Sequence, residues 1–485
     1  MKQQKWKSKS FALLLAIMMV FTMMPQMAFA DDTVAVPQEA GSASSAQHVI
    51  VSTADELAQW GGVDFTGTIE LANDINMNGV TMQPIKSLNG MFEGNGYTIS
   101  NLTLSGEATS TTWDAPNVGL GLIAQLNGTV QNLKLENVQI TSSSTSKIYA
   151  GAVVGMIEAA NASITNCAAM GSITLPENSS GNHAGGMIGM ITGSVDANAS
   201  VVIKNCVSDI TVSSGTYPGG VLGKLEGPYA SLKLQGCAVL GNVNITSSNG
   251  TGAGIIGLTY GKVLDIQKTY FAGEATSTKG SSSKASAFLN FPNRGTRPTI
   301  NISECYYNGS NKGKVVPDYT VTIPADAVIP KSTDELKALK LEGFEAKEGC
   351  FGGYPVPSWL TTLGAGPHKV TVTAVGASKV TLLSKDGATT EMTAGENGVF
   401  TASDLAAGLY TYTAETSLTD KDTATGTLVV GKVDKAMTIT LPEKVADTEI
   451  TVAGPEAAVL EVYQGTDANG TLMKEKSAEN GAADI

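Results

Sequence analysis

Four glycines recur in this chain at intervals of 34 residues: Gly155, Gly189, Gly223 and Gly257. Each closes a phrase of small and apolar residues, such as Gly-Gly-Met-Ile-Gly at 185–189. A fixed period of this size indicates a solenoid, a propeller or another repeat array. Because a propeller blade needs a longer repeat of about 40 to 45 residues, the period predicts one coil of a parallel β-helix. Glycine at a coil corner supplies either a positive φ or a close approach of two backbones.

A cysteine, or a substitute for it, follows each of these glycines by 12 to 17 residues: Cys167, Cys206, Cys237 and Tyr270, with Cys305 continuing the series. The intervening runs are short, β-branched and alternating, as strands are, and Ser, Asn and Gly clusters separate them. We therefore expect an all-β chain that begins with a right-handed parallel β-helix, whose coils bury their apolar faces by stacking. The aligned cysteines predict an interior column of small hydrophobic side chains. Five cysteines cannot all pair, and Cys350 lies outside the column.

The first 30 residues have the pattern of a secretory signal peptide. Four lysines precede an apolar run at 11–24, and Ala28-Phe29-Ala30 offers a small-residue cleavage site. We expect cleavage after Ala30 and a secreted or cell-surface protein. No later stretch holds 18 or more consecutive apolar residues, so the sequence predicts no membrane-spanning segment after cleavage.

The charge balance argues against nucleic acid as a partner. The chain has a formal charge of −13, which becomes −17 when the four lysines of the signal segment are removed. An acidic balance of this size favours the solubility of an extracellular protein.

The pattern of elements divides the chain into five segments: a signal peptide at 1–30, a flexible leader at 31–48, a β-helix with capping helices at 49–362, a β-sandwich module at 367–442, and the start of a second, incomplete β module at 443–485. The sandwich is predicted from six short alternating strands, which begin near Lys369 and end near Thr440 and are joined by turns such as Asp386-Gly387. The last segment shows two more strand patterns and then stops, which favours either a truncated gene or a fragment of a longer chain.

Two distinctive phrases flank the repeats. Phe-Glu-Gly-Asn-Gly-Tyr-Thr-Ile-Ser-Asn-Leu occupies 92–102, and Gly-Gly-Tyr-Pro-Val-Pro-Ser-Trp occupies 352–359. Together with the Gly-Gly-apolar-apolar-Gly coils between them, these phrases resemble bacterial surface proteins that carry GLUG-motif repeats, over about 49–360. The resemblance implies an adhesin-like β-helix. The phrase at 400–410, which ends in Ala-Gly-Leu-Tyr, resembles the carboxypeptidase-regulatory-like or PEGA-like modules of secreted proteins.

Both ends of a β-solenoid need covers, because they expose unpaired strand edges. A helix pattern stands at each boundary: one with Thr53 as N-cap and Glu56 in the capping-box position, and one just after Ser332. We expect these helices to cover the two ends. Trp60 and Trp359 are interpreted as packing within the covers rather than as ligand-binding residues.

The sequence offers little for catalysis. Of the three histidines, His48 is expected in the leader, His183 in a loop and His368 in the linker between modules. None belongs to a His-Glu-x-x-His zinc motif, so although GLUG repeats also occur in immunoglobulin A peptidases, the residues argue against that activity. A Ser-His-Asp triad needs a structured histidine and a buried acid. The sparse acidic residues of the coils do not suggest the close pair that a glycosidase needs. We predict no catalytic residue, no cofactor and no metal ion.

Two features are candidates for ligand contact. Arg294 and Arg297, the only arginines, share a loop at 290–298 that interrupts the last coil; it is either an interaction site or a plain surface insertion. Tyr217 and Tyr260, like Tyr149 and Tyr229, stand near coil corners. They form either a ligand-facing strip or a cover for coil edges, and both interpretations stay open.

Our leading prediction is a non-catalytic binding protein, which presents a β-helical rod to a host or bacterial surface glycan, a matrix protein or a surface polymer. A polysaccharide lyase or glycoside hydrolase on the same helix is one alternative. A structural stalk for a domain beyond Ile485 is another.

Overall fold

A computed structural model describes residues 47–106, 118–144, 147–158, 160–177, 181–193, 199–279, 285–291, 298–313, 315, 323–324, 326–364 and 368–444, together with strand backbones within 451–484. The predicted signal peptide, Arg294 and Arg297 lie outside the described residues. The chain divides into two compact units. The larger, Ala40–Glu415 with Ala424–Thr440, holds the repeats and the sandwich; the smaller holds Met1–Glu39, Thr416–Thr423 and Leu441–Ile485.

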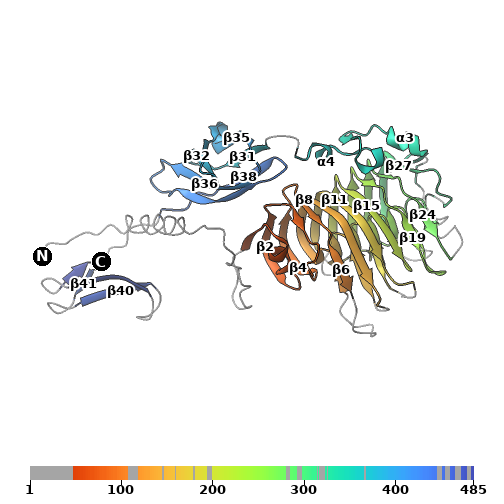
Figure 1. The fold of residues 1–485 in the computed structure, drawn as a ribbon, viewed down its shortest axis with the longest axis horizontal. Coiled ribbons are helices and arrows are strands. Elements are labelled where there is room, and N and C mark those ends of the chain that lie inside the picture. Colours follow the sequence, from red (N-terminus) through yellow and green to blue (C-terminus); the bar gives the residue numbers. More distant parts are fainter. Residues whose placement is uncertain are drawn as a thin grey trace. The chain divides into compact units, whose positions relative to one another are not determined.

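Stacked parallel strands form most of the larger unit, as the sequence predicts (Figure 1). In order they are β1 (Gln47–Val51), β2 (Asp64–Leu71), β3 (Ile75–Asn76), β4 (Ile85–Glu93), β5 (Thr98–Ser100), β6 (Thr103–Gly106), β7 (Val118–Leu120), β8 (Ile123–Ser142), β9 (Ile148–Gly151), β10 (Val154–Glu158), β11 (Asn161–Thr174), β12 (His183–Gly185), β13 (Ile188–Thr192), β14 (Ala199–Lys204), β15 (Val207–Ser214), β16 (Leu222–Glu226), β17 (Ala230–Gln235), β18 (Ala238–Val239), β19 (Val243–Ile245), β20 (Gly252–Ala253), β21 (Ile256–Thr259), β22 (Val263–Gln267), β23 (Tyr270–Phe271), β24 (Ala275–Ser277), β25 (Ala285–Ser286), β26 (Thr299–Ser303), β27 (Cys305–Asn308) and β28 (Val328–Lys331).

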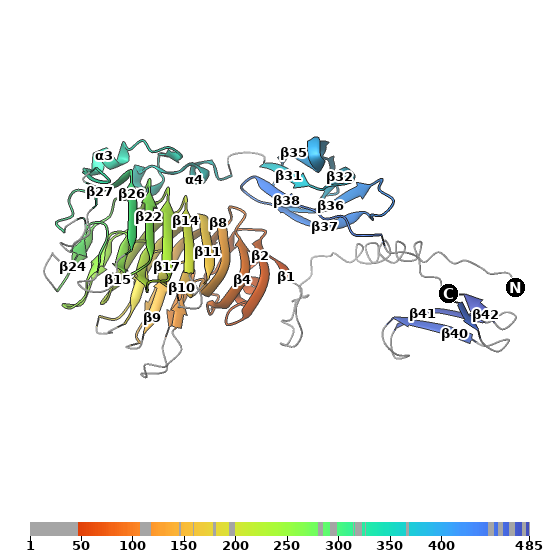
Figure 2. The ribbon, with the colours of Figure 1, turned by 180° about the vertical axis from the view of Figure 1, so that it is seen from behind.

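Most of these strands pair with their counterparts in the next coil rather than with their neighbours in sequence; at the two ends, β1 pairs with β2 and β27 pairs with β28. Among the described residues, 23 strands join one sheet in which every described pairing is parallel. The strands follow one another in sequence order along the stack in both views (Figures 1 and 2). This arrangement is a parallel β-helix, and it confirms the predicted fold class.

The interior of the coils is a continuous apolar core that contains the predicted cysteine column. Cys167, Cys206, Cys237 and Cys305 are free thiols with at most 2% of their surface exposed. Each thiol donates to the carbonyl oxygen two residues earlier, at 3.2 to 3.4 Å. The residue just before each of these cysteines has a positive φ: Asn166, Asn205, Gly236 and Glu304. Lys268, which precedes Thr269 in the intervening coil, has a positive φ as well. A small side chain that donates to this carbonyl therefore suits the position after each turn.

Tyr270 does not hold the column position, so that prediction is wrong. The register pairs Ala238 with Tyr270, which places Thr269 opposite Cys237. Thr269 is fully buried, and its hydroxyl donates to the Gln267 carbonyl at 3.0 Å, the same bond that the thiols make. Tyr270 faces outward instead, where its hydroxyl donates to the Pro355 carbonyl at 2.5 Å. Threonine in place of cysteine keeps the hydrogen-bond donor at the column position, whereas a tyrosine there would not.

Among the described residues, three short helices accompany the coils: α2 (Ala54–Ala58), α3 (Thr333–Lys337) and α4 (Ser358–Thr362), with a 3-10 turn at Phe351–Gly353. The predicted capping box of Thr53 and Glu56 is present at α2. Leu57 and Trp60 join the core there, and Trp60 meets Phe65 edge-on with ring centroids 5.0 Å apart. The N-terminal helix therefore covers the start of the core, as expected.

The second helix does not simply cover the far end. The α3–α4 segment (333–363) starts beside β27 and β28 and runs back along one side of the coils (Figures 1 and 2). Leu336, Leu341, Val356 and Leu360 of the segment belong to one buried cluster with outward-facing residues of successive coils, among them Val207 and Ala238. Trp359 Nε1 donates to the Asn205 carbonyl at 2.8 Å. Small apolar side chains on the outside of several coils need cover from water, and this requirement lays the segment along the side.

Two four-stranded sheets follow the β-helix, at the six predicted strands. They comprise β31 (His368–Thr373), β32 (Ala377–Ser384), β33 (Thr389–Glu391), β34 (Thr393–Ala394), β35 (Val399–Leu405), β36 (Gly408–Thr416), β37 (Ala424–Val430) and β38 (Lys435–Thr438), with a 3-10 turn at Glu396–Gly398. Their described pairings are antiparallel except that of β31 with β38. The smaller unit contains β39 (Thr451–Ala453) paired with β42 (Ala482–Asp484), and β40 (Val459–Gln464) paired with β41 (Thr471–Ser477). Among the described residues, no helix is long and apolar enough to cross a membrane.

Candidate functional site: a lateral cavity beside a column of stacked rings

The repeated glycines bring a strand of one coil into direct contact with a strand of the preceding coil. A Cβ on Gly189 would lie 2.5 Å from the Ala150 nitrogen and from the Tyr149 carbonyl carbon, far inside van der Waals contact. None of the four glycines of the 34-residue repeat has a positive φ. Of the two roles predicted for them, close backbone approach is therefore the one they perform. Strand β13, which contains Gly189, therefore lies against β9 of the preceding coil.

This close approach aligns three rings in register along the stack. Strand pairing sets His183 against Tyr149, and an isolated bridge between Gly185 and Gly219 continues the register to Tyr217. The Tyr149 and His183 rings stack with centroids 5.2 Å apart and planes 14° apart. The His183 and Tyr217 rings follow at 5.4 Å and 38°. We call Tyr149, His183 and Tyr217 the ring column.

The strand after each glycine supplies a second row of side chains. Met156, Met190 and Lys224 are register partners on β10, β13 and β16. Tyr149 packs with the two methionines. Lys224 lies beside the rings instead, with Nζ 5.7 Å from the Tyr217 centroid and 5.5 Å from the Tyr260 centroid. A cation at this distance from an aromatic face is attracted to it.

A cavity of about 700 Å³ opens beside these residues on the coils. We call it the lateral cavity; its lining includes Tyr149, His183, Tyr217, Lys224, Glu226 and the turn at 247–250. Tyr217 and Tyr260 are half-buried, whereas Tyr149 and His183 are only 4% and 5% exposed. The column therefore runs from the interior at Tyr149 to the surface at Tyr217.

Burial sets the protonation of the column. Burial, with the positive charges of Lys224 and Lys147, lowers the pKa of His183 to about 3, so its imidazole is neutral at physiological pH. Burial and the carboxylates of Glu226 and Glu158 raise the pKa of Tyr149 to about 12. His183 Nδ1 is buried and has no hydrogen-bond partner. Burying a ring nitrogen without a hydrogen bond costs free energy of folding unless a hydrogen-bonding group pairs with it.

Tyr217 adopts a backbone conformation that is unusual for a bulky residue. Its φ is +48°, in the left-handed region that side chains other than Asn, Asp and Gly rarely occupy. Such a conformation costs on the order of 1–3 kcal/mol and persists where the surroundings fix it. The turn at Tyr217 sets its ring at the mouth of the column.

The structure brings together two of the four candidate residues. Tyr217 and Tyr260, 43 positions apart in the sequence, flank the same lysine, while Arg294 and Arg297 lie outside the described residues. His183 stands on β12 rather than in the predicted loop, and His48 and His368 also lie on strands, β1 and β31. The sequence held a signal for His183. It precedes Gly189 by six residues, as Tyr149 precedes Gly155 and Tyr217 precedes Gly223.

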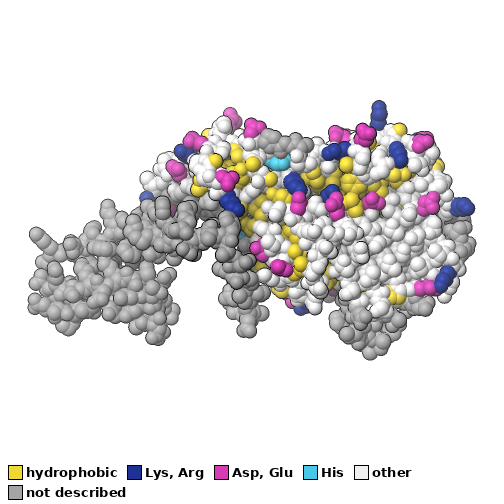
Figure 3. Space-filling view, in the orientation of Figure 1, with side chains coloured by type: hydrophobic (Ala, Val, Ile, Leu, Met, Phe, Trp, Pro, Cys, Tyr) yellow, Lys and Arg dark blue, Asp and Glu magenta, His cyan; other side chains and the backbone are white. Residues whose placement is uncertain are grey.

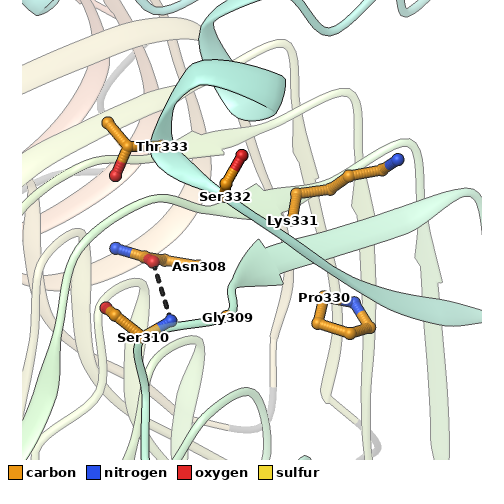
Figure 4. A pocket seen from close by; sticks show the side chains of 7 residues that line it. All are labelled: Asn308, Gly309, Ser310, Pro330, Lys331, Ser332 and Thr333. Carbon is orange, nitrogen blue, oxygen red and sulfur yellow. Dashed lines mark hydrogen bonds between the residues drawn. The ribbon is translucent and has the colours of Figure 1, made fainter.

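A second hollow near the far end of the coils is smaller, and the side chain of its Asn308 already forms hydrogen bonds within the chain. It measures about 460 Å³ and is lined by residues 308–310 and 330–333 (Figure 4). Asn308 Oδ1 accepts from the Ser310 backbone nitrogen at 3.0 Å, and its amide donates to the Ala272 carbonyl at 3.0 Å. Because the side-chain oxygen and nitrogen of its buried Asn308 already bond within the chain, we favour the lateral cavity as the candidate site. In the part of the chain that the structure describes, no three His, Cys, Asp or Glu side chains group as a metal site would.

Comparison with known proteins adds a distant likeness. No protein-family model matches the chain, and no curated protein sequence matches it. It is similar to a crystal structure from Bacteroides ovatus described as "a putative immunoglobulin A1 protease", with a TM-score of 0.39 and 18% identity over 64% of this chain and 92% of that chain. The geometry described above defines the class: a mostly β protein with a long parallel β-helix and a ring-lined cavity on its side.

Proposed function

We propose that the chain is a secreted or cell-surface, non-catalytic binding protein, which uses its β-helix to hold a glycan, a matrix protein or a surface polymer. The observation that carries the proposal is the lateral cavity, where stacked rings and polar groups converge on a rigid stack of coils. Pockets that bind ligands combine apolar walls with a few placed polar groups. The signal-peptide pattern and the phrases that resemble GLUG-repeat surface proteins support an extracellular, adhesin-like role.

A rigid scaffold suits this role. The side chains of the site come from strands and turns that successive coils hold in register, so little order has to be gained when a ligand binds. Each glutamate at the cavity has a lysine partner: Glu226 pairs with Lys224, and Glu177 pairs with Lys279 at 2.5 Å. A general acid or base needs a carboxyl free to exchange a proton with a substrate, so these ion pairs favour binding over hydrolysis.

The test is an array of glycans and matrix proteins probed with the full chain, followed by assays for reducing ends and unsaturated products on every hit. We expect binding without product. Released product would refute the proposal in favour of a lyase or hydrolase. If no probe on the array is bound, a structural stalk would be favoured.

Matched tyrosine variants connect any hit to the site. Tyr217→Ala and Tyr260→Ala are each expected to weaken binding by about two- to tenfold, because an aromatic contact contributes roughly 0.5–1.5 kcal/mol. Tyr412→Ala changes a half-buried tyrosine of the sandwich and should bind as the unaltered chain does. Equal loss in all three variants would place the binding surface elsewhere.

A further inference from the structure

The turn at Asn95, in the first of the two distinctive phrases, contacts the sandwich within the larger unit. The Lys432 backbone nitrogen donates to the Asn95 carbonyl oxygen at 2.7 Å, and Tyr97 Oη donates to the Val430 carbonyl oxygen at 3.4 Å. A Cβ on Gly431 would overlap the Asn95 carbonyl oxygen, so the absence of a side chain permits this contact. Asn95 is therefore buried where the coils meet the sandwich, with 1% of its surface exposed.

Three side chains meet at the carboxamide of this residue: Asn95 itself, Glu70 of β2 and Lys435 of β38. Asn95 Nδ2 donates to Glu70 Oε1 at 2.9 Å and to the Leu71 carbonyl oxygen at 2.8 Å, which fixes the orientation of the amide. Its oxygen faces Lys435, whose Nζ donates to Oδ1 at 3.1 Å. Lys435 Nζ also contacts the Glu70 carboxylate. We call Glu70, Asn95 and Lys435 the amide triad.

The amide triad is largely shielded from water. Glu70 is 4% exposed, and 17% of the Lys435 side chain is exposed. Burial alone would raise the pKa of Glu70, but the hydrogen bond from His48 and the contacts with Lys435 and Asn95 lower it to about 2. The resting triad is therefore an ion pair in contact with an amide. A buried lysine that passes its proton to a contacting carboxylate becomes a neutral amine, which is a nucleophile.

We infer that the amide triad forms a covalent isopeptide bond between the side chains of Lys435 and Asn95, which links the β-helix to the sandwich. Glu70 takes a proton from the Lys435 ammonium group, and the neutral amine attacks the carbonyl carbon of Asn95. The bond between Nζ and Cγ forms, and the bond between Cγ and Nδ2 breaks. Glu70 carries the protons of the former amine to Nδ2, which leaves as ammonium and regenerates the carboxylate. No group is oxidised or reduced.

The reaction needs the folded chain. Asn95 and Lys435 are 340 positions apart in the sequence, and only the contact between the coils and the sandwich brings them together. Two groups held in reacting contact behave as if at an effective concentration of up to about 10⁵–10⁸ M, which offsets the unfavourable proton transfer from lysine to glutamate. The bond would keep the sandwich attached to the coils after their noncovalent contacts break. This inference is independent of the ligand-binding role proposed above.

Mass spectrometry of tryptic peptides from the purified full chain tests the bond. Trypsin cuts after lysine, but a linked Lys435 is no longer cut. We expect a branched peptide in which 87–134, which contains Asn95, is joined to 433–444, with the summed mass of the two peptides less one ammonia. An unlinked chain gives 87–134, 433–435 and 436–444 as separate peptides. These peptides without the branched one would overturn the inference.

Variants test the role of each residue. Lys435→Arg keeps a positive charge beside Glu70 but has no nucleophilic amine, so the branched peptide should disappear. Glu70→Gln removes the proton carrier and should slow the appearance of the branched peptide after refolding by about 10²–10⁴-fold; an unaltered rate would overturn the triad. Lys432→Arg is the matched control, because Lys432 Nζ contacts the Asp74 carboxylate at 2.6 Å rather than an amide, and it should link as the unaltered chain does. Circular dichroism shows that each variant is folded.

A competing reaction of Asn95 also releases ammonia, so the branched peptide decides between the two. The side chain of an asparagine that precedes glycine can close a ring onto the next backbone nitrogen, here that of Gly96. This nitrogen is engaged, since it donates to the Asn132 carbonyl oxygen at 2.7 Å. A loss of ammonia from 87–134 that persists in Lys435→Arg, with no branched peptide in the unaltered chain, would assign the loss to the ring and overturn the inference.

Discussion

The buried imidazole of His183 should make the folded chain lose stability as the pH falls, and replacing it should remove that loss. The ordinary pKa of histidine is 6.5, and burial lowers the pKa of His183 to about 3. Between these values the unfolded chain binds a proton at this position and the folded chain does not. The contribution of this residue is therefore constant above pH 6.5 and becomes progressively destabilising as the pH drops from 6.5 towards 3.

The magnitude follows from the width of that window. One pKa unit corresponds to about 1.4 kcal/mol, so a fall from pH 7.5 to pH 4.5, of which about two units lie below 6.5, costs about 3 kcal/mol at this site. His183→Gln places a neutral amide in the column and cannot take up the proton. The variant should therefore lose about 3 kcal/mol less than the unaltered chain between these two pH values.

Urea unfolding at pH 7.5 and pH 4.5 measures the difference. Other groups titrate over this range, but they are common to both proteins, and the comparison cancels them. His368→Gln, in the sandwich, is the matched control; it leaves His183 in place and should keep the pH dependence of the unaltered chain. If the unaltered chain and His183→Gln lose the same free energy, or if the His183 ring titrates near pH 6.5 by NMR, the imidazole is not held neutral by burial.

Three further changes test the architecture around the site. Gly189→Ala should lower the free energy of unfolding by about 3 kcal/mol or more, because its Cβ would meet backbone 2.5 Å away. Gly79→Ala is the control: it has open space around it and a φ of +82°, so it should lower this free energy by only about 1 kcal/mol. Equal losses in urea unfolding would contradict the close-approach role of Gly189. Thr269→Val leaves the Gln267 carbonyl without its donor and should lower the free energy of unfolding by about 1–3 kcal/mol. Thr269→Cys keeps a donor, so its free energy of unfolding should stay within about 1.5 kcal/mol of that of the unaltered chain. A smaller loss for the valine variant than for the cysteine variant in urea unfolding would refute the donor role. Ser332→Ala removes the cap of α3 and should lower stability by about 1 kcal/mol, seen as faster hydrogen exchange over 333–337; unchanged exchange would contradict it.

Local patterns were sufficient to predict the architecture. The 34-residue period and the alternating β-branched runs require coils that stack, because no single coil can bury its apolar face. The capping box at Thr53 and the six strands of the sandwich follow from residues a few positions apart, so they could be assigned without knowledge of any distant contact.

The residues that were misplaced are those whose position depends on register. Thr269 and Tyr270 are neighbours in the chain, and a shift of one residue in a strand exchanges the inside for the outside. Only the pairing of Ala238 with Tyr270 shows which of them faces the core. Likewise, the α3–α4 segment follows an apolar strip along the side of the coils that is assembled from residues of several repeats, and no one repeat displays it.

The sequence by itself determined that this chain is a stack of β coils with glycine at a fixed place in each coil, because periodicity and side-chain size are local properties. The tertiary structure alone decided that Tyr149, His183 and Tyr217 form one ring column, and that Lys224 lies between Tyr217 and Tyr260 beside it. These groups meet only because strands one coil apart lie in register and because a glycine without a Cβ lets two backbones touch. The protonation of His183 depends on the same packing, since burial among other coils lowers its pKa.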